Sequence, residues 1–149
     1  MKTLKLHQGV LLDIYSAHTE TRLERPLVSP GISAGFPSPA MDFEDLSIDL
    51  NKHLIQHPSS TFYGRVKGQS MKDAGIDDGD LLVIDKSLEP KNGKIAVCFV
   101  DGEFTIKRIK IEKDCCWLMP ANEKYKPIQV TADNDFLIWG IVIHVIKSL

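Results

Sequence analysis

The sequence predicts a mostly β fold, a compact β domain with a flexible N-terminal arm. Short runs rich in β-branched and aromatic residues recur from residue 61 to the end of the chain. Turn-forming Asp-Gly and Asn-Gly pairs separate several of these runs. The runs do not alternate with long helical patterns, so we expect a small mixed or antiparallel β fold and not repeated βαβ units.

The composition indicates one globular domain with a small appendage. The 149 residues are 43% hydrophobic and 26% charged, which is ordinary for a chain that buries a core. A formal net charge of -2 gives no general attraction to phosphate backbones, so direct specific DNA binding is not expected. No apolar run is long enough to cross a membrane or to form a signal peptide.

The cysteines predict neither a disulfide framework nor a metal site. Cys98 lies in an apolar run, and Cys115 and Cys116 are adjacent, so no C-x-x-C spacing occurs. A reducing cytoplasm suits such thiols, and we expect a cytoplasmic protein without a metal or other cofactor.

Residues 1–34 show no sustained helical or strand period and are interpreted as the arm. Residues 26–39 carry four prolines and two glycines, which exclude a long helix and favour extended or turning backbone. Residues 46–57 predict a short amphipathic helix with Leu46, Leu50 and Leu54 on one face, ended by Pro58.

The β-rich part of the chain predicts six strands, with Asp101-Gly102 as the clearest hairpin signal. The pair lies between two apolar runs, so the flanking strands should be antiparallel neighbours. The predicted strands span residues 61–66, 80–85, 94–100, 103–111, 116–119 and 136–146.

The alternation of apolar residues changes phase within residues 103–111. Phe104 and Ile106 share one face and Ile109 the other, which predicts a bulge near Lys107 or Arg108. A bulge would aim Lys107 inward, where desolvation lowers the pKa of an amine and lets it act as a base. On the residues alone a solvated strand lysine is the favoured interpretation, because a base needs demonstrated geometry and burial.

Ser70 lies in Gly-Gln-Ser-Met at residues 68–71 and has two interpretations. With Asp73 it matches S-x-x-D, so it could cap a single helical turn that Gly75 ends. A serine at a helix start also lies beside free backbone N–H groups, which can stabilise an oxyanion during acyl transfer. None of the five histidines lies in a recognisable Ser/His/Asp context.

Two further patterns are weak. Gly31, Ser33 and Gly35 form G-x-S-x-G, but prolines flank the motif where a nucleophile elbow needs a strand and a helix. His53 and His57 are four residues apart, yet no glutamate follows His53 and no third ligand is evident. A surface or helix-end role is therefore favoured over metal binding.

Several separated segments resemble the LexA, UmuD and phage-repressor family of Ser-Lys autoproteases, peptidase family S24. The resemblance covers about three quarters of the chain, from Ala34 to the C-terminus, and the segments share their order and spacing with the family. They are residues 34–40, 54–58, 68–71, 75–82, 101–107 and 140–145.

The resemblance implies a catalytic LexA/UmuD-like β domain at residues 35–149, with Ser70 as nucleophile and Lys107 as general base. It implies self-cleavage between Ala34 and Gly35, which removes the arm at residues 1–34. Backbone N–H groups at or beside Ser70 are then candidate oxyanion donors. Gln69 and Met71, on either side of Ser70, are the candidate oxyanion or positioning residues. Thr105 lies two residues before Lys107 on the same strand face and is a candidate to position the lysine amine.

The resemblance also implies partners. They are a second copy of the chain in a homodimer, a RecA filament on single-stranded DNA that promotes cleavage, and a UmuC-like Y-family subunit of a translesion polymerase of the polymerase V type. These belong to the SOS response to DNA damage.

Two alternatives remain open at this point. One is a polymerase-regulating binding module with an inactive Ser-Lys dyad. The other is a LexA-like repressor that lacks its DNA-binding domain, because about 34 residues before the cleavage site are too few for a helix-turn-helix domain.

Overall fold

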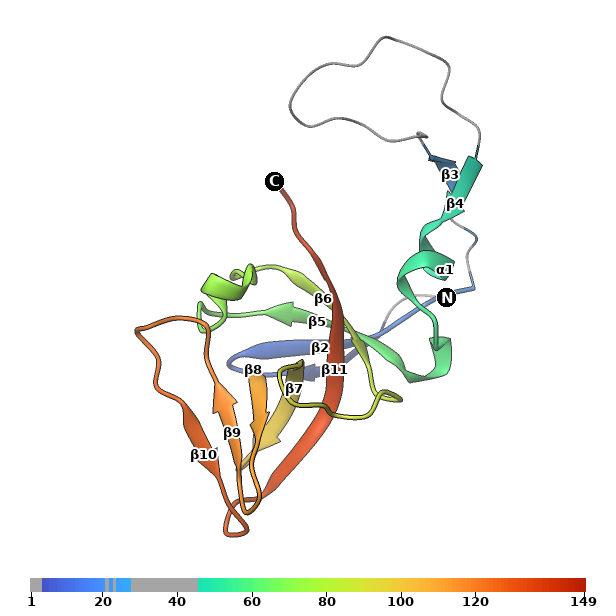
Figure 1. The fold of residues 1–149 in the computed structure, drawn as a ribbon. Helices are drawn as coiled ribbons and strands as arrows, with labels where there is room; N and C mark the ends of the chain where they lie inside the picture. The colour runs from blue at the N-terminus through green and yellow to red at the C-terminus, as the bar shows by residue number, and fades with distance from the viewer. Residues whose placement is uncertain (1–3, 21, 23, 28–45) are drawn as a thin grey trace. The chain divides into compact units, whose positions relative to one another are not determined.

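The computed structural model describes residues 4–20, 22, 24–27 and 46–149. The chain forms two units, one of residues 1–17 with 57–149 and one of residues 18–56. Within the described residues the first unit contains a nine-stranded sheet in which all neighbouring strands are antiparallel, so the prediction of a mostly β fold is confirmed. The strands follow the order β1-β2-β5-β6-β11-β7-β8-β9-β10 across the sheet (Figure 1).

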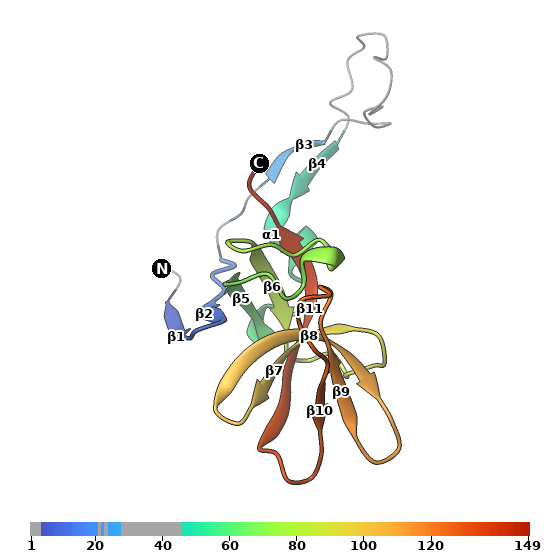
Figure 2. The same ribbon diagram turned by 90° about the vertical axis from the view of Figure 1, so that its left-hand side faces the viewer.

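The long strand β11, dark red in Figure 1, lies between β6 and β7 in the sheet. Strands β7, β8, β9 and β10 follow in that order across the sheet; Figure 2 shows the ribbon from a second side, with the β8–β9 hairpin near the viewer's lower right. In chain order the strands of this sheet are β1 (Lys5–Gln8), β2 (Leu12–Ser16), β5 (Thr61–Val66), β6 (Leu81–Asp85), β7 (Ile95–Val100), β8 (Glu103–Ile111), β9 (Cys116–Met119), β10 (Ile128–Val130) and β11 (Phe136–Ile146). All six predicted strands are confirmed, two of them with a start one residue later.

The hairpin between β7 and β8 turns at Asp101 and Gly102, as predicted. Both residues have positive φ, 46° and 94°, which is the backbone of a tight turn whose twist matches the flanking strands. The Asp101 carboxylate accepts hydrogen bonds from the Asn134 side chain and the Asp135 backbone N–H. These bonds connect the hairpin to the start of β11 and so stabilise the position of β8.

The bulge predicted near Lys107 is wrong. The register of β7 against β8 is continuous, with Lys107 opposite Ala96 and Arg108 opposite Ile95. The apolar residues change face because β8 contributes to two cores, Ile106 to one and Ile109 to the other. Regular alternation therefore turns Lys107 toward the same face as Ile109.

The two cores lie on opposite faces of β7 and β8, since their residues alternate along these strands. The second core is small and contains two small side chains directly opposite the polar residues of β8. The first core contains Leu12, Ile14, Val66, Met71, Ile76, Leu82, Ile84, Val97 and Ile106; the second contains Ala96, Cys98, Ile109, Leu118, Val130 and Ile141.

Strands β1 and β2 lie in the region that the sequence analysis interprets as an arm. Leu12 and Ile14 of β2 are buried in the first core, and Asp13 between them is also buried. Its carboxylate pairs with Lys67 at 2.9 Å and with Lys5 at 3.3 Å. Because three consecutive residues are buried, β2 lacks the alternation that identifies a half-exposed strand.

The second unit contains a hairpin of β3 (Glu24–Leu27) and β4 (Leu46–Asp49), followed by α1 (Leu50–Leu54). The predicted helix at residues 46–57 is therefore wrong at both ends, because residues 46–49 form β4 and α1 ends at Leu54, before the predicted stop at Pro58. The Asp49 side chain accepts a hydrogen bond from the Asn51 backbone N–H at 3.0 Å, so the helix begins only after this cap. No helix in the described part of the chain is long and apolar enough to cross a membrane.

Residues 28–45 lie outside the described residues. They include the predicted cleavage site at Ala34 and Gly35 and the G-x-S-x-G pattern that begins at Gly31. The division of the chain into residues 1–34 and 35–149 therefore stays a prediction.

Candidate active site

Ser70 lies in a tight turn, residues 68–75, between β5 and β6. Gly68 and Gly75 have φ values of 95° and 79°, which are strained for residues with a side chain, so glycines suit both ends of the turn. Met71 is 2% exposed and packs into the first core, which anchors the turn. The turn contains a 3-10 helix, Lys72–Ala74, which ends at Gly75 as predicted.

Ser70 does not cap that helix. The residue at the cap position is Met71, and no side chain bonds there. The Ser70 Oγ lies instead 3.0 Å from the Lys107 Nζ, so the capping interpretation of Ser70 is wrong.

Lys107 reaches Ser70 from the middle of β8. Its Nζ also lies 2.9 Å from the Thr105 Oγ1 and 3.0 Å from the Ile106 carbonyl oxygen. The structure thus places the predicted residues Ser70, Lys107 and Thr105 together, and it adds the Ile106 carbonyl, which sequence reasoning missed. A backbone acceptor carries no signal in the side-chain pattern.

Burial changes the acid-base chemistry of this lysine. Lys107 is 5% exposed and lies on the face of β8 that carries the second core, opposite Ala96. Burial lowers the pKa of Lys107 to about 8, against an opposing influence of neighbouring Cys98. Because burial also raises the pKa of the Cys98 thiol to about 12, that thiol stays neutral beside the amine near neutral pH.

The three neighbours of the Lys107 Nζ match both of its protonation states. An ammonium has three N–H donors, and three oxygen acceptors surround it. A neutral amine has two N–H donors and one lone pair. When the Thr105 hydroxyl and the Ile106 carbonyl accept hydrogen bonds from the two N–H groups, the lone pair is left to accept the hydroxyl proton of Ser70.

These residues lie in a groove of about 300 Å³. Apolar side chains line one part of it, namely Leu11, Val100, Tyr125 and Ile128, and charged Lys67, Glu103 and Lys126 line another. Ser70, Lys107, Thr105 and Gln69 line the same groove. A larger cavity of about 500 Å³ lies between residues 87–94 and β11, but none of the predicted site residues lines it.

The loop between β9 and β10 holds the Ser70 turn by three hydrogen bonds. The Ala121 N–H donates to the Ser70 carbonyl at 2.8 Å, and the Asp73 N–H donates to the Ala121 carbonyl at 2.7 Å. The Asn122 Nδ2 donates to the Gln69 carbonyl at 2.8 Å. Sequence reasoning missed this loop. A proline followed by a small residue and an asparagine predicts a turn, but it does not predict which segment the turn will contact.

Neither His53 nor His57 lines the groove. His53 belongs to the last turn of α1. The His57 Nδ1 lies 2.5 Å from the Asp85 Oδ2, while the Asp85 Oδ1 accepts hydrogen bonds from the Ser87 hydroxyl and backbone N–H. His57 is thus bound to a buried carboxylate, and no cluster of metal ligands occurs in the described part of the chain.

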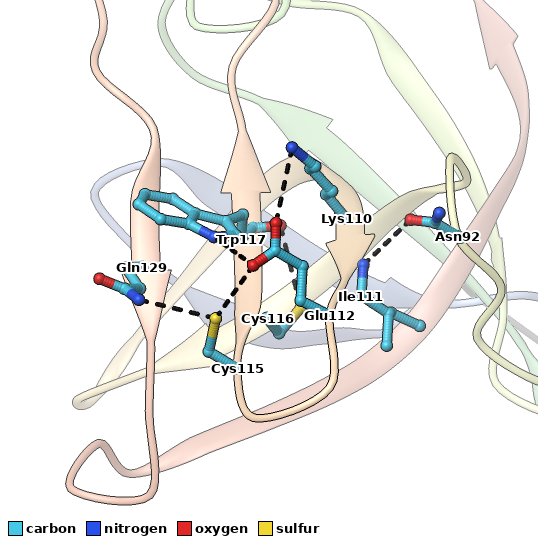
Figure 3. A network of polar contacts seen from close by, with 8 residues as sticks. All are labelled: Asn92, Lys110, Ile111, Glu112, Cys115, Cys116, Trp117 and Gln129. Carbon is cyan, nitrogen blue, oxygen red and sulfur yellow. Dashed lines mark hydrogen bonds and ion pairs between the residues drawn. The ribbon is translucent and has the colours of Figure 1, made fainter.

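The three cysteines are free thiols. Cys98 is buried in the second core. Cys115 lies in the network at the end of the β8–β9 hairpin shown in Figure 3, where its Sγ contacts Glu112 and Gln129, each at 3.6 Å. The Trp117 ring N–H donates to the same Glu112 carboxylate, so this network stabilises the hairpin end.

Comparisons with known proteins identify the family of the chain. The family model described as Peptidase S24-like matches residues 26–143. Protein MucA of Salmonella typhimurium is 40% identical over 135 residues, covering 89% of this chain and 92% of MucA. Protein ImpA of Shigella flexneri is 40% identical over 122 residues, 82% of this chain and 83% of ImpA.

The LexA repressor of Alcanivorax borkumensis is 39% identical over 126 residues, which cover 84% of this chain but 60% of that repressor. The family model and the MucA match each span most of the chain. The chain therefore belongs to the peptidase S24 family, as its resemblance to the LexA, UmuD and phage-repressor proteins predicts.

Proposed function

We propose that this chain is a UmuD-like self-cleaving serine endopeptidase in which Ser70 is the nucleophile and Lys107 the general base. Membership of the S24 family supports a serine-peptidase activity. The observation that carries the proposal is the 3.0 Å contact between the Lys107 Nζ and the Ser70 Oγ. A serine hydroxyl needs an adjacent base to become a nucleophile, and a buried lysine is such a base when its pKa is lowered toward neutrality.

In the proposed reaction the neutral Lys107 amine accepts the Ser70 hydroxyl proton, and the Ser70 Oγ attacks the Ala34 carbonyl carbon. Backbone N–H groups beside Ser70 donate to the oxyanion that forms. The Lys107 ammonium then donates its proton to the departing Gly35 amine, and the Ala34–Gly35 bond breaks. Water hydrolyses the Ser70 ester and completes the turnover.

The residues at the proposed cleavage site suit a tethered substrate. Ala34 needs only a small pocket, and Gly35 can adopt backbone angles that bend the segment sharply. Tethering gives the segment a high effective concentration, so little binding affinity is needed. Cleavage must then be controlled by the conformation of the chain.

The family suggests what controls and uses the cleavage. In our proposal a RecA filament on single-stranded DNA favours the cleavage-competent conformation over the other. The product, residues 35–149, forms a homodimer and joins a UmuC-like Y-family polymerase subunit in translesion synthesis during the SOS response. The matches to MucA and ImpA over most of their lengths support this role.

The test is incubation of the purified chain near neutral pH with RecA, ATP and single-stranded DNA, followed by intact mass spectrometry. We expect two products whose masses correspond to residues 1–34 and 35–149, and no products from the Ser70→Ala variant. An intact wild-type chain, or a cut elsewhere, contradicts the proposal.

A further inference from the structure

The carbonyl groups of Gln69 and Ser70 are both held by the loop between β9 and β10. The Gln69 carbonyl accepts from the Asn122 Nδ2, and the Ser70 carbonyl accepts from the Ala121 N–H, each at 2.8 Å. Two successive peptide planes on either side of the Ser70 Cα are thus attached to two successive residues of another loop.

Fixing a carbonyl also fixes an N–H group. In a planar trans peptide the carbonyl oxygen and the N–H of the next residue point in opposite directions. The bond from Asn122 therefore orients the Ser70 N–H, and the bond from Ala121 orients the Met71 N–H. Among the described residues neither N–H donates to an acceptor, so both remain free for a ligand.

Asn122 is itself held in one orientation. Its Oδ1 accepts from the Lys124 N–H at 3.0 Å, and its backbone carbonyl accepts from the Tyr125 N–H at 3.0 Å. With Oδ1 on a donor and Nδ2 on an acceptor, the side-chain amide has one arrangement that satisfies both neighbours. Tyr125 also lines the groove that contains Ser70, so the same loop contacts both the turn and the groove.

We propose that Asn122 is a positioning residue that orients the Gln69–Ser70 peptide, so that the Ser70 N–H points at the oxyanion formed when Ser70 attacks a carbonyl. The Ala121 backbone does the same for the Met71 N–H. Asn122 does not touch the substrate in this account, and it acts only through the Gln69 carbonyl. The inference rests on the proposed function of Ser70.

The test compares self-cleavage of the full chain with that of Asn122→Ala and Asn122→Asp between pH 7 and 10. Alanine removes the side-chain donor to Gln69 and leaves its carbonyl only the longer bond from the Lys72 N–H at 3.2 Å. Aspartate keeps the acceptor for Lys124 but places a carboxylate oxygen against the Gln69 carbonyl. We expect the plateau rate at high pH to fall roughly 10- to 100-fold in both variants, since one oxyanion donor is misdirected.

The pH profile separates positioning from a loss of structure. If Asn122 acts only on the oxyanion donors, the midpoint of the profile stays that of the wild type. If its removal loosens the Ser70 turn, Lys107 becomes solvated and the midpoint moves upward. Gln8→Ala is the control, because it removes an exposed side-chain amide on β1, and its rate should equal the wild-type rate.

A plateau rate within twofold of the wild type in Asn122→Ala overturns the inference, and so does a lower rate with a shifted midpoint. Neither result affects the role of Ser70. A wild-type chain that is not cut at any pH overturns the proposed function, and this inference with it.

Discussion

The Ser70 Oγ and the Lys107 Nζ lie 3.0 Å apart, although 37 positions separate the two residues in the sequence. Ser70 is held by the loop between β9 and β10, and Lys107 by the continuous register of β7 against β8. The β9–β10 loop and the β7–β8 pairing both belong to the nine-stranded sheet. The contact between Ser70 and Lys107 therefore depends on the folded sheet and not on a local sequence motif.

Thr105→Val should slow self-cleavage about tenfold. Valine keeps the shape of threonine but removes the acceptor 2.9 Å from the Lys107 Nζ, so one N–H of the amine loses its partner and the lone pair is no longer directed at Ser70. Thr105→Ser restores the acceptor and should retain most of the activity. First-order cleavage rates at pH 10 decide the matter, and equal rates in Val and Ser variants would exclude a positioning role for Thr105.

Lys107→Met should stabilise the fold below pH 8. The folded pKa of Lys107, about 8, lies below its ordinary value of 10.5, so the buried ammonium destabilises the fold at low pH. This cost is fully present below pH 8 and disappears as the pH rises to about 10.5. After allowance for the lost hydrogen bonds, we expect a gain of about 1 to 3 kcal/mol in the free energy of unfolding at pH 6.

Urea denaturation of the Lys107→Met variant and the wild type at pH 6 and pH 10 measures this difference. The gain should shrink at pH 10. If the stability of Lys107→Met minus that of the wild type is smaller at pH 6 than at pH 10, the ammonium is not destabilising. Ser70→Ala in both backgrounds prevents cleavage during the measurement.

Asp85→Asn should destabilise the first unit by about 1 to 3 kcal/mol at pH 7. Burial alone would raise the pKa of Asp85, but hydrogen bonds from Ser87 and His57 lower it below its usual value. The carboxylate therefore stabilises the fold above its unfolded pKa of about 3.8, and this contribution is lost as the pH falls through the lower folded value.

The stability difference between wild type and Asp85→Asn should accordingly shrink below pH 4, which urea denaturation at pH 7 and pH 3 can measure. Asp114→Asn is a matched control at an exposed position and should change little. A difference that is constant between the two pH values would contradict the role given to the Asp85 charge.

Ala34→Trp should reduce cleavage on the order of 100-fold if Ala34 supplies the attacked carbonyl, because a bulky side chain displaces that carbonyl from Ser70. Ala40→Trp carries the same change six residues further on and should be cleaved at the wild-type rate. Intact mass spectrometry after incubation at pH 10 distinguishes them. Rapid cleavage of Ala34→Trp between residues 34 and 35 would argue against a small pocket.

The sequence predicted six of the seven strands between residues 61 and 146 but not β10; Asp101 and Gly102 dictate a tight hairpin, and the flanking residues favour strands. It could not predict β2, whose buried Asp13 hides the strand pattern until its partner Lys67, 54 positions away, is known. The helix at residues 46–57 was predicted too long because pairing of β4 with β3 outweighs a weak apolar period.

The site was predicted in part. The family resemblance indicated Ser70 and Lys107, but the proposed bulge was a wrong explanation for the inward direction of Lys107, which follows from strand alternation between two cores. The contacts of Asn122 and of the Ile106 carbonyl could not be predicted from the sequence. Their contacts depend on the tertiary path of two loops and on backbone atoms, and neither is encoded in a local pattern of residue types.

The most direct test of the account is the rate of self-cleavage without RecA between pH 6 and pH 11, for the wild type and for Ser70→Ala and Lys107→Ala. We expect the wild-type rate to rise as the pH passes through about 8 and then to level off, because the Lys107 amine becomes neutral there. Both variants should stay intact at every pH. Cleavage that persists in Lys107→Ala with the wild-type pH profile would contradict the assignment of Lys107 as the base.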